Sequence, residues 1–552
     1  MPRFNLARLL LCGVLLPPLA LAEPPAPLDE TLRLLEQERR QREARERQER
    51  LRQLQRQQPV TKPALPAPVT EPNEPCWPVP GVSLSGNQLL EDVALSQALK
   101  PGLRACMGAT AVRGVLAALT QAYVTKGYIA ARAYLRTSPQ PNQPLQVLID
   151  EGFVESIELG EGEPALSLAH AFPGMIGRPL HLPQLEQGLD QLNRLRSVNL
   201  TAQILPGSLE GGSRVVLRSL SHASPLFASL GYKNAAPAAT GRVVVLAGVG
   251  LDNPFGLNDQ ITLAFVQTVG NAPNYSHAVN LGYRVPYGPW TLTTSFTHGE
   301  QFIATGRLNT RYLSENSSAQ LDRTLWRNQQ AIVSAGLRLD HKSTRRHIGH
   351  INLFEPDPRL SVLQASLDLL WLGKTSLAAQ LSYAQGVGWL GANPRPTSHS
   401  RPQPRFEQYR AYLTHNWVGG AWRWESALEL QYSPDLLPGT EQLQLANATT
   451  VRGFRDNPLS ASSGAIWRNE LSIQQPLTAN LTLTPHVAVD YGRGWLSLYG
   501  TTSTPTLAAA SSGATLAWPA GKLKLDYQKG LSLKHAPGAE PGFWNMELSL
   551  YF

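Results

Sequence analysis

The chain has 552 residues, of which 16% are charged, and its formal net charge is +8. This charge is mild and is not gathered into one long basic tract, which argues against a nucleic-acid-binding protein. After the N-terminal region no stretch reaches the ~18 apolar residues of a spanning helix. However, 12 Trp, 16 Tyr and many strand-like segments fit a membrane-spanning barrel.

Residues 1–22 have the features of a secretory signal peptide. Arg3 and Arg8 give a basic start, Leu9–Ala20 is a short apolar run, and residues 20–22 are a small-residue cleavage site. A retained anchor helix is the alternative, but the apolar run is too short to span a bilayer comfortably. We therefore predict that the protein is exported.

A polar helix and a linker are expected next. Residues 28–58, within the segment 23–58, contain no proline, and the middle of this predicted helix is polar all round. Such a helix suits a solvated tail, a short coiled coil or a water-filled channel. Residues 59–75 are rich in proline, so we expect an extended, semi-rigid linker that lets the helix move independently.

Two small α/β modules are predicted at 76–152 and 153–221, both in the order β-α-α-β-β. The first module contains a helix at Thr110–Lys126, with apolar residues at helical spacing and Gly127 directly after it. Neither module contains a phosphate-binding glycine loop or a catalytic cluster. Both are therefore predicted to be binding modules, whose sheet edges could accept an extended peptide.

Cys12 lies in the predicted signal peptide and is lost when the peptide is cleaved, so two cysteines remain, Cys76 and Cys106. In an oxidising compartment an even number of spaced cysteines favours a disulfide, although two buried free thiols are the alternative. A metal site would need more ligands than these two.

From residue 222 to 552 short alternating segments follow one another. In 275–285 the aromatic and aliphatic residues share one face, and small or polar residues share the other. This is the lipid-out, polar-in pattern of a transmembrane barrel, whereas a soluble sandwich would turn its polar face outward. The last segment places one apolar face at the end of the chain, made of Trp544, Met546, Leu548, Leu550 and Phe552. The length of the region predicts about 16 strands, an even number.

One long stretch, 433–464, interrupts this pattern between two alternating strands. It has little periodicity, and long loops of this kind are usually functional, although a mobile surface loop is the alternative. At its centre is Val451-Arg452-Gly453-Phe454, in which glycine allows close backbone approach and arginine offers a rigid fork of donors. In a later strand, 489–492, alternation turns Asp490 and Gly492 toward the inside.

Known catalytic and nucleotide motifs are absent from the sequence, so neither an enzyme nor a cofactor is expected. His341, His347 and His350 lie close to Arg345 and Arg346. A metal site there is possible, but a solvated strand end or loop is favoured, and no metal is predicted.

Taken together, these features resemble the two-partner secretion outer-membrane transporters, the haemolysin and filamentous haemagglutinin secretion family. The resemblance covers nearly the whole chain. It implies a signal peptide, a plug helix, a linker, two POTRA (polypeptide-transport-associated) modules and a 16-stranded antiparallel outer-membrane β-barrel. Its most specific matches are Val451-Arg452-Gly453-Phe454, similar to the tip of an inward-folding loop, and Asp490-x-Gly492, similar to an inner-wall motif.

The resemblance also implies roles for these residues. Arg452 and Asp490 would form a bidentate, charge-assisted pair that fixes the loop, and Cys76 and Cys106 stand where the first POTRA module often carries a pair. The implied partner is a secreted β-helical exoprotein, an adhesin, haemolysin or toxin, and the implied surroundings are outer-membrane lipid and the periplasm. A monomer is expected.

Three alternative functions stay open. A barrel assembly factor of the same superfamily would commonly carry more modules and no polar helix. A passive porin or small-molecule receptor would leave the modules without purpose. A soluble periplasmic enzyme is disfavoured by the last strand and by the missing motifs.

Overall fold

The computed structural model describes residues 76–552, apart from positions 101, 235, 306–307, 349–350, 353–358, 374, 397–400, 448–449, 499–500 and 536–537. The expected signal peptide, polar helix and linker lie outside the described residues. Within the described residues no helix combines the length and the hydropathy needed to cross a membrane.

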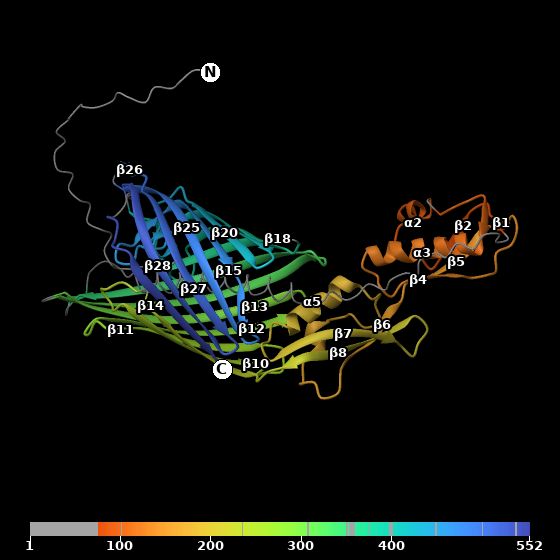
Figure 1. Ribbon diagram of the computed structural model, residues 1–552, viewed down its shortest axis with the longest axis horizontal. Coiled ribbons are helices and arrows are strands. Elements are labelled where there is room, and N and C mark those ends of the chain that lie inside the picture. Colours follow the sequence, from red (N-terminus) through yellow and green to blue (C-terminus); the bar gives the residue numbers. More distant parts are fainter. Residues whose placement is uncertain are drawn as a thin grey trace, which may run out of the picture.

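The first module is a three-stranded sheet covered by two helices (Figure 1). Its elements are β1 (Cys76–Pro78), β2 (Val82–Ser85), α2 (Asp92–Leu99), β3 (Cys106–Gly108), α3 (Ala109–Thr125), β4 (Arg132–Leu135) and β5 (Leu145–Asp150). Val112, Val115 and Leu119 of α3 are buried, as their helical spacing predicts. The first helix begins at Asp92 and not earlier, at Gln88 or Leu89. The Glu151 carboxylate accepts the backbone N–H groups of Gln88 and Leu89, which holds that segment outside the helix.

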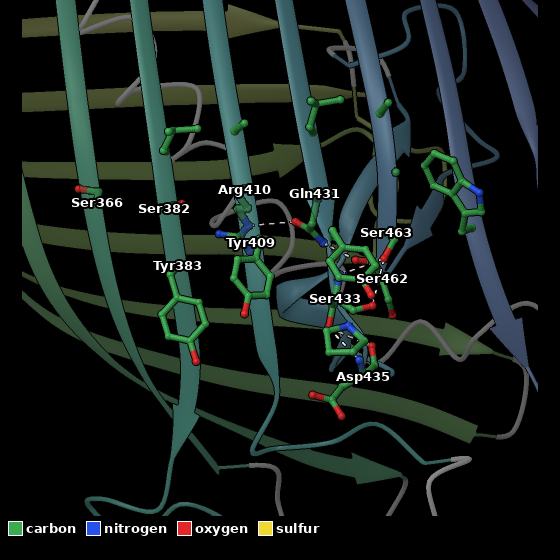
Figure 2. Close-up of a pocket in the computed structure, with 18 of the residues that line it drawn as sticks. Ser366, Ser382, Tyr383, Tyr409, Arg410, Gln431, Ser433, Asp435, Ser462 and Ser463 are labelled. Carbon is green, nitrogen blue, oxygen red and sulfur yellow. Dashed lines mark hydrogen bonds between the residues drawn. The ribbon is translucent and has the colours of Figure 1, made fainter.

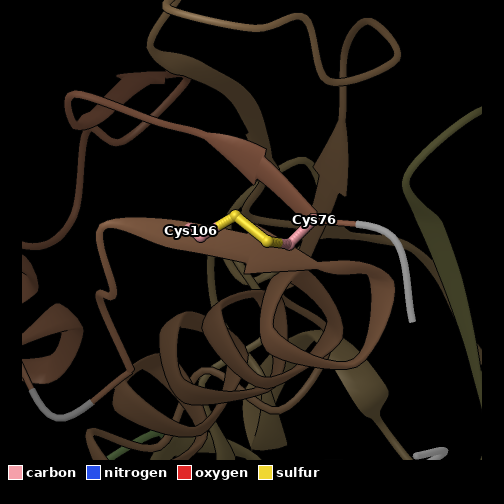
Figure 3. The surroundings of a disulfide bond; sticks show 2 residues. All are labelled: Cys76 and Cys106. Atoms are coloured by element: carbon pink, nitrogen blue, oxygen red, sulfur yellow. A yellow bond between two sulfur atoms is a disulfide. The ribbon is translucent and has the colours of Figure 1, made fainter. Parts of the chain in front are cut away.

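Cys76 and Cys106 form a disulfide between the short strands β1 and β3, as Figure 3 shows. Their Cα atoms lie 5.4 Å apart, within the usual range for such a bond. The disulfide ties the start of the described chain to the segment that leads into α3. Buried free thiols, the alternative, are thereby excluded.

The second module has the order β-α-α-β-β, without counterparts of the short strands β1 and β3, and lies against one end of the barrel (Figure 1). Its elements are β6 (Phe153–Leu159), α4 (Leu168–Ala171), α5 (Leu182–Leu192), β7 (Val198–Pro206) and β8 (Gly212–His222). Helix α5 buries its apolar side, with Leu185 and Leu189, in the module. Its polar side is also buried, because it meets the barrel: Gln191 donates to the carbonyl of Gly288 at 2.9 Å.

The rest of the described chain closes into a barrel of sixteen spanning antiparallel strands, in which β29 pairs back with β9. The strands are β9 (Leu226–Lys233), β10 (Val243–Asp252), β11 (Gln260–Val269), β12 (Tyr275–Tyr287), β13 (Trp290–Thr305), β14 (Leu308–Arg327), β15 (Ala331–Ile348), β17 (Arg359–Trp371), β18 (Thr375–Val387), β19 (Glu407–Gly419), β20 (Trp422–Tyr432), β23 (Ser463–Ile473), β25 (Leu481–Leu498), β27 (Thr506–Trp518), β28 (Gly521–Lys534) and β29 (Phe543–Tyr551). Three short pieces, β16 (Ile351–Asn352), β24 (Gln475–Thr478) and β26 (Thr501–Ser503), extend the ends of neighbouring strands.

The barrel is apolar outside and polar inside. On β12, Val279 and Leu281 are exposed on the outer face, whereas Ser276 and Ala278 turn inward and are buried. The inward positions of a barrel this wide line a polar interior, which the alternation predicted. Closure of β29 onto β9 leaves no open sheet edge in the wall, a requirement for strands in a lipid bilayer.

Candidate functional site: the loop folded into the barrel

The connection between β20 and β23 turns back into the barrel and carries more structure than its sequence suggested. It contains a short 3-10 turn at Gly439–Glu441 and a small hairpin formed by β21 (Leu443–Ala446) and β22 (Leu459–Ala461). The expectation of an irregular segment was wrong in this respect. Leu443 and Leu445 alternate with polar neighbours over too few residues to stand out, and the hairpin partners are separated by a long tip.

Hydrogen bonds join the two ends of this loop where it leaves the barrel wall. Ser433 donates its backbone N–H to the Ser463 hydroxyl at 3.0 Å, and Gln431 donates to the carbonyl of Ser462 at 3.0 Å, as Figure 2 shows. The two ends of the loop therefore start from one fixed point. Tyr383 and Tyr409 in the same view belong to the outer face of the barrel, where their rings lie 5.2 Å apart.

A second set of contacts joins Glu441 of the loop to the inner wall of the barrel. Lys342 of β15 donates to the Glu441 carboxylate at 2.7 Å, and both side chains are almost fully buried. The backbone carbonyl of Glu441 accepts from Gln408, Arg410 and Gln431. A buried pair of this kind fixes one geometry because breaking it leaves an uncompensated charge.

The hairpin and the tip build a small apolar core inside the barrel. Leu445, Val451 and Phe454 are fully buried against the inner wall, with Ile466, Leu507 and Ala509. Burying one side chain such as Phe454 contributes about 1.5–3 kcal/mol. The tip is thus held by desolvation as well as by polar contacts.

Arg452 is the polar centre of the tip. Its Nε and Nη2 donate to the two carboxylate oxygens of Asp490, each at 2.7 Å, and its backbone N–H reaches the same carboxylate at 3.1 Å. The remaining fork position, Nη1, donates to Glu470 at 2.9 Å. Burial alone would lower the pKa of Arg452, but the hydrogen bonds and charges of Asp490 and Glu470 outweigh burial and raise it.

The loop tip approaches the inner wall closely at the two motif glycines, Gly453 and Gly492. Gly453 has φ +89°, and a Cβ there would overlap the backbone of Lys529 and Gly530 on β28. A Cβ at Gly492 would come 2.7 Å from the Val451 side chain. Each glycine therefore makes room for the tip to lie directly on the wall.

Sequence reasoning missed several charged residues that surround this pair. Glu470 of β23 is the second acceptor for Arg452, and Lys524 of β28 lies 3.5 Å from it. Farther along, buried His486 contacts Asp526, which Lys524 also approaches at 3.7 Å. Inward parity was the available signal, since all four residues alternate to the inner face. Parity alone does not distinguish them from other lumenal polar residues.

The second module is fixed to the barrel by a buried charged group. Arg327, at the end of β14, contacts Glu186 at 3.3 Å and pairs with Asp190, both on α5. All three side chains are about nine-tenths buried. The module and the barrel wall are therefore joined by contacts that tolerate little change of angle.

The histidines near the end of β15 do not gather into a metal site in the described part of the chain. His341 contacts the Ser361 hydroxyl at 3.0 Å, and His347 lies six residues farther along β15. His350 lies outside the described residues. No group of three or more His, Cys, Asp or Glu suited to a metal occurs among the described residues.

Most of the chain is similar to known transporters. The family described as "Haemolysin secretion/activation protein ShlB/FhaC/HecB" matches residues 211–516, a ShlB-type POTRA domain matches 77–152, and a further POTRA domain matches 153–206. The hemolysin transporter protein ShlB of Serratia marcescens is 33% identical over 530 residues, which cover 93% of this chain and 92% of the relative. The outer membrane transporter CdiB of Escherichia coli is 28% identical over 474 residues, covering 82% and 79%.

Comparison of folds agrees with the sequence matches. The solved structure of CdiB from Escherichia coli superposes with a TM-score of 0.86 at 25% identity, covering 97% of this chain and all of that one. The modules thus stand in the periplasm. The inward-folding loop leaves the barrel at the other, extracellular end. The alternative of a barrel assembly factor is disfavoured. The chain belongs to the haemolysin secretion/activation family, the outer-membrane transporters of two-partner secretion.

Proposed function

We propose that this protein is the pore through which one large exoprotein crosses the outer membrane in an extended form. The observation that carries the proposal is the loop 433–464, which occupies the lumen of a closed barrel through contacts that can be undone. Arg452 of the loop is joined to Asp490 and Glu470 of the wall by hydrogen bonds, which polar groups of the cargo can replace when the loop leaves. A loop held in this way obstructs the pore without being part of its wall.

The POTRA modules supply the recognition surface. In the first module β4 is an edge strand of the sheet, because the strand order is β2-β5-β4. Tyr134 of β4 lies directly opposite Leu148 of β5, and the two side chains are 52% and 41% exposed. An unfolded N-terminal segment of the exoprotein could add as a strand beside β4 and lay its apolar side chains on this pair.

The loop tip acts in gating, and its residues are structural rather than catalytic. Val451 and Phe454 hold the tip in the apolar core at the inner wall, and Arg452 binds the tip to Asp490. The absence of side chains at Gly453 and Gly492 lets the tip lie directly on the wall. The polar segment 23–58 serves as a plug helix that leaves the lumen before the cargo enters. Release of the loop then widens the path.

The energy for transport comes from the cargo itself. The periplasm lacks ATP, and the sequence contains no nucleotide or catalytic motif, so transport proceeds without an enzymatic step, a cofactor or a metal. Folding of the exoprotein, as an adhesin, haemolysin or toxin of β-helical form, opposes backsliding once its first segment is outside. The transporter works as a monomer embedded in outer-membrane lipid.

The test is to delete the gene for this chain and to follow two sets of proteins. One neighbouring exoprotein should accumulate in the periplasm while other outer-membrane barrels keep their normal levels. A general loss of barrels would instead identify an assembly factor. Secretion should return with the full chain and fail with a chain lacking residues 76–152, provided that the truncated barrel still reaches the outer membrane.

A further inference from the structure

The barrel closes at a seam between its first and last strands. Strand β9 pairs with β29 from Ser229 to Lys233, opposite Tyr551 to Glu547. Beyond Lys233 the described residues form no further strand pair, and Asn234 makes the next contacts with β29. Its backbone N–H and amide oxygen bond to Met546, and its amide nitrogen donates to the carbonyl of Trp544 at 2.9 Å. Among the described residues, the extracellular end of the seam is therefore held by one residue, Asn234, rather than by continued strand pairing.

The inward-folding loop lies over this end of the seam. Directly after the tip, the backbone N–H groups of Arg455, Asp456 and Asn457 all donate to the Glu540 carboxylate, at 3.0, 2.9 and 2.8 Å. Glu540 is only 7% exposed and stands three residues before β29 begins at Phe543. The Arg455 guanidinium lies over the Phe543 ring, 4.2 Å from its centre. These contacts tie the loop to the last-strand side.

Two of these three loop residues, Arg455 and Asp456, also hold the first-strand side. Asp456 accepts the backbone N–H of Ala238 at 2.9 Å and the guanidinium of Arg242 at 2.9 Å, both in the connection from β9 to β10. Arg455 donates to the carbonyl of Asn234 at 3.4 Å. Residues 455–457 thus bridge the two strands that close the barrel.

We propose that residues 455–457 are a latch across the barrel seam, anchored by Glu540 on one side and by Arg242 on the other. Glu540 and Arg242 are positioning residues: they act through the loop and touch no cargo. Because Arg452 and Arg455 are only three residues apart, the tip cannot leave Asp490 without straining the latch. Withdrawal of the loop and loosening of the seam at its extracellular end are therefore one coupled step.

The coupling has a physical basis in the weakness of the seam end. Without the latch, the partner that the described residues give to 543–546 of β29 across the seam is Asn234, and strand ends with few partners open first. Loosening there would let the barrel circumference adjust, because the ladder would open from Lys233 toward Ser229. The inference extends the proposed gating role, but its first test needs no cargo and stands apart from the fate of that proposal.

The first experiment measures hydrogen exchange in the purified full chain. Glu540→Ala removes the acceptor for three N–H groups, and the loss of even one charge-assisted bond corresponds to about tenfold or more in an opening equilibrium. We expect amides of 543–547 and of 230–234 to exchange at least about tenfold faster. Asp435→Asn is the matched control: Asp435 also accepts a backbone N–H and an arginine, but at the loop base, away from the seam. Faster exchange confined to residues 450–460 would overturn the latch.

The second experiment asks whether the latch acts through the seam. Leu230 and Leu550 are opposite each other in the ladder, so Leu230→Cys with Leu550→Cys allows the seam to be locked by oxidation. Glu540→Ala should increase ion conductance in planar bilayers when this pair is reduced, and oxidation should abolish the increase. An increase that survives oxidation would show that Glu540 holds only the loop. If Glu540→Ala does not reach the membrane, Arg242→Gln tests the first-strand side in the same two assays.

Discussion

Arg452 and Asp490 meet on the inner wall of the barrel with two parallel hydrogen bonds of 2.7 Å, and the backbone of Arg452 adds a third to the same carboxylate. Asp490 is 1% exposed, so its charge is satisfied almost entirely by the loop tip. This relationship makes the loop conformation depend on one carboxylate of the wall.

Replacing Asp490 should release the tip. Asp490→Asn leaves the shape but removes the charge, and breaking one partner of a shielded pair costs roughly 3–5 kcal/mol. We expect the loop to become sensitive to external protease and secretion of the exoprotein to fall. Glu470→Gln should have a smaller effect, because Glu470 makes a single bond to Arg452 and is more exposed. Unchanged secretion together with unchanged protease sensitivity of Asp490→Asn would contradict a clamping role.

Substitution of Gly453 should prevent the tip from seating. An alanine there needs φ near +89°, which costs about 1–2 kcal/mol, and its Cβ would also overlap the backbone of Gly530. Gly453→Ala should therefore lower secretion and expose the loop to protease, while the barrel still resists heat in detergent. Gly538→Ala is the matched control, since nothing lies within 4 Å of a Cβ at that extracellular position. Equal behaviour of the two variants would show that the close approach is unimportant.

Much of the architecture could be predicted because it follows from local periodicity. Alternation of Val279 with Ala278 gave the barrel faces, and the same parity turned Asp490 inward before any partner was known. The disulfide Cys76–Cys106 was also confirmed, as was the β-α-α-β-β order of the second module, whereas the first module adds the short strands β1 and β3 to that order.

The remaining features depend on contacts between distant parts of the chain. Glu540 lies 83 to 85 residues from its three donors, and Lys342 lies 99 residues from Glu441. Neither separation leaves a local pattern, because a buried glutamate in a loop has the same sequence context as an exposed one. Inward-facing polar residues of a barrel share the same sequence pattern, so the pattern does not show which of them contact the loop.

The joint between the second POTRA module and the barrel should fail when its buried charge is unbalanced. Arg327→Gln leaves the carboxylates of Glu186 and Asp190 without the guanidinium. Removing one partner of a buried charged group lowers the stability of the joint by roughly 3–5 kcal/mol. We expect a mobile module, seen as increased protease cleavage between β8 and β9, and lower secretion. The double variant Arg327→Gln with Asp190→Asn should recover part of the loss. If the single and double variants are equally impaired, the charge balance does not hold the joint.

The joint between the two POTRA modules should respond to pH through His181. Its ring lies 5.0 Å from the Tyr128 ring, and Leu182 donates its backbone N–H to the carbonyl of Gly127, so this contact fixes the angle between the modules. Burial lowers the pKa of His181 below its ordinary value of 6.5, although a backbone contact with Lys126 opposes this. The separated state therefore binds a proton more readily than the docked state. Docking should be strongest above about pH 6.5 and weaken as the pH falls through the lowered pKa of the docked form.

The measurement is the cleavage rate between Val124 and Leu182 over pH 5 to 8, with a protease whose own pH profile is subtracted. His181→Gln removes the titrating group and should flatten the profile of the joint, whereas His222→Gln, on an exposed side chain of β8, should leave it unchanged. A profile that keeps its shape in His181→Gln would assign the pH dependence to another group. Because the joint sets how far the first module can swing from the barrel, a flattened profile should be matched by secretion that no longer varies across this range.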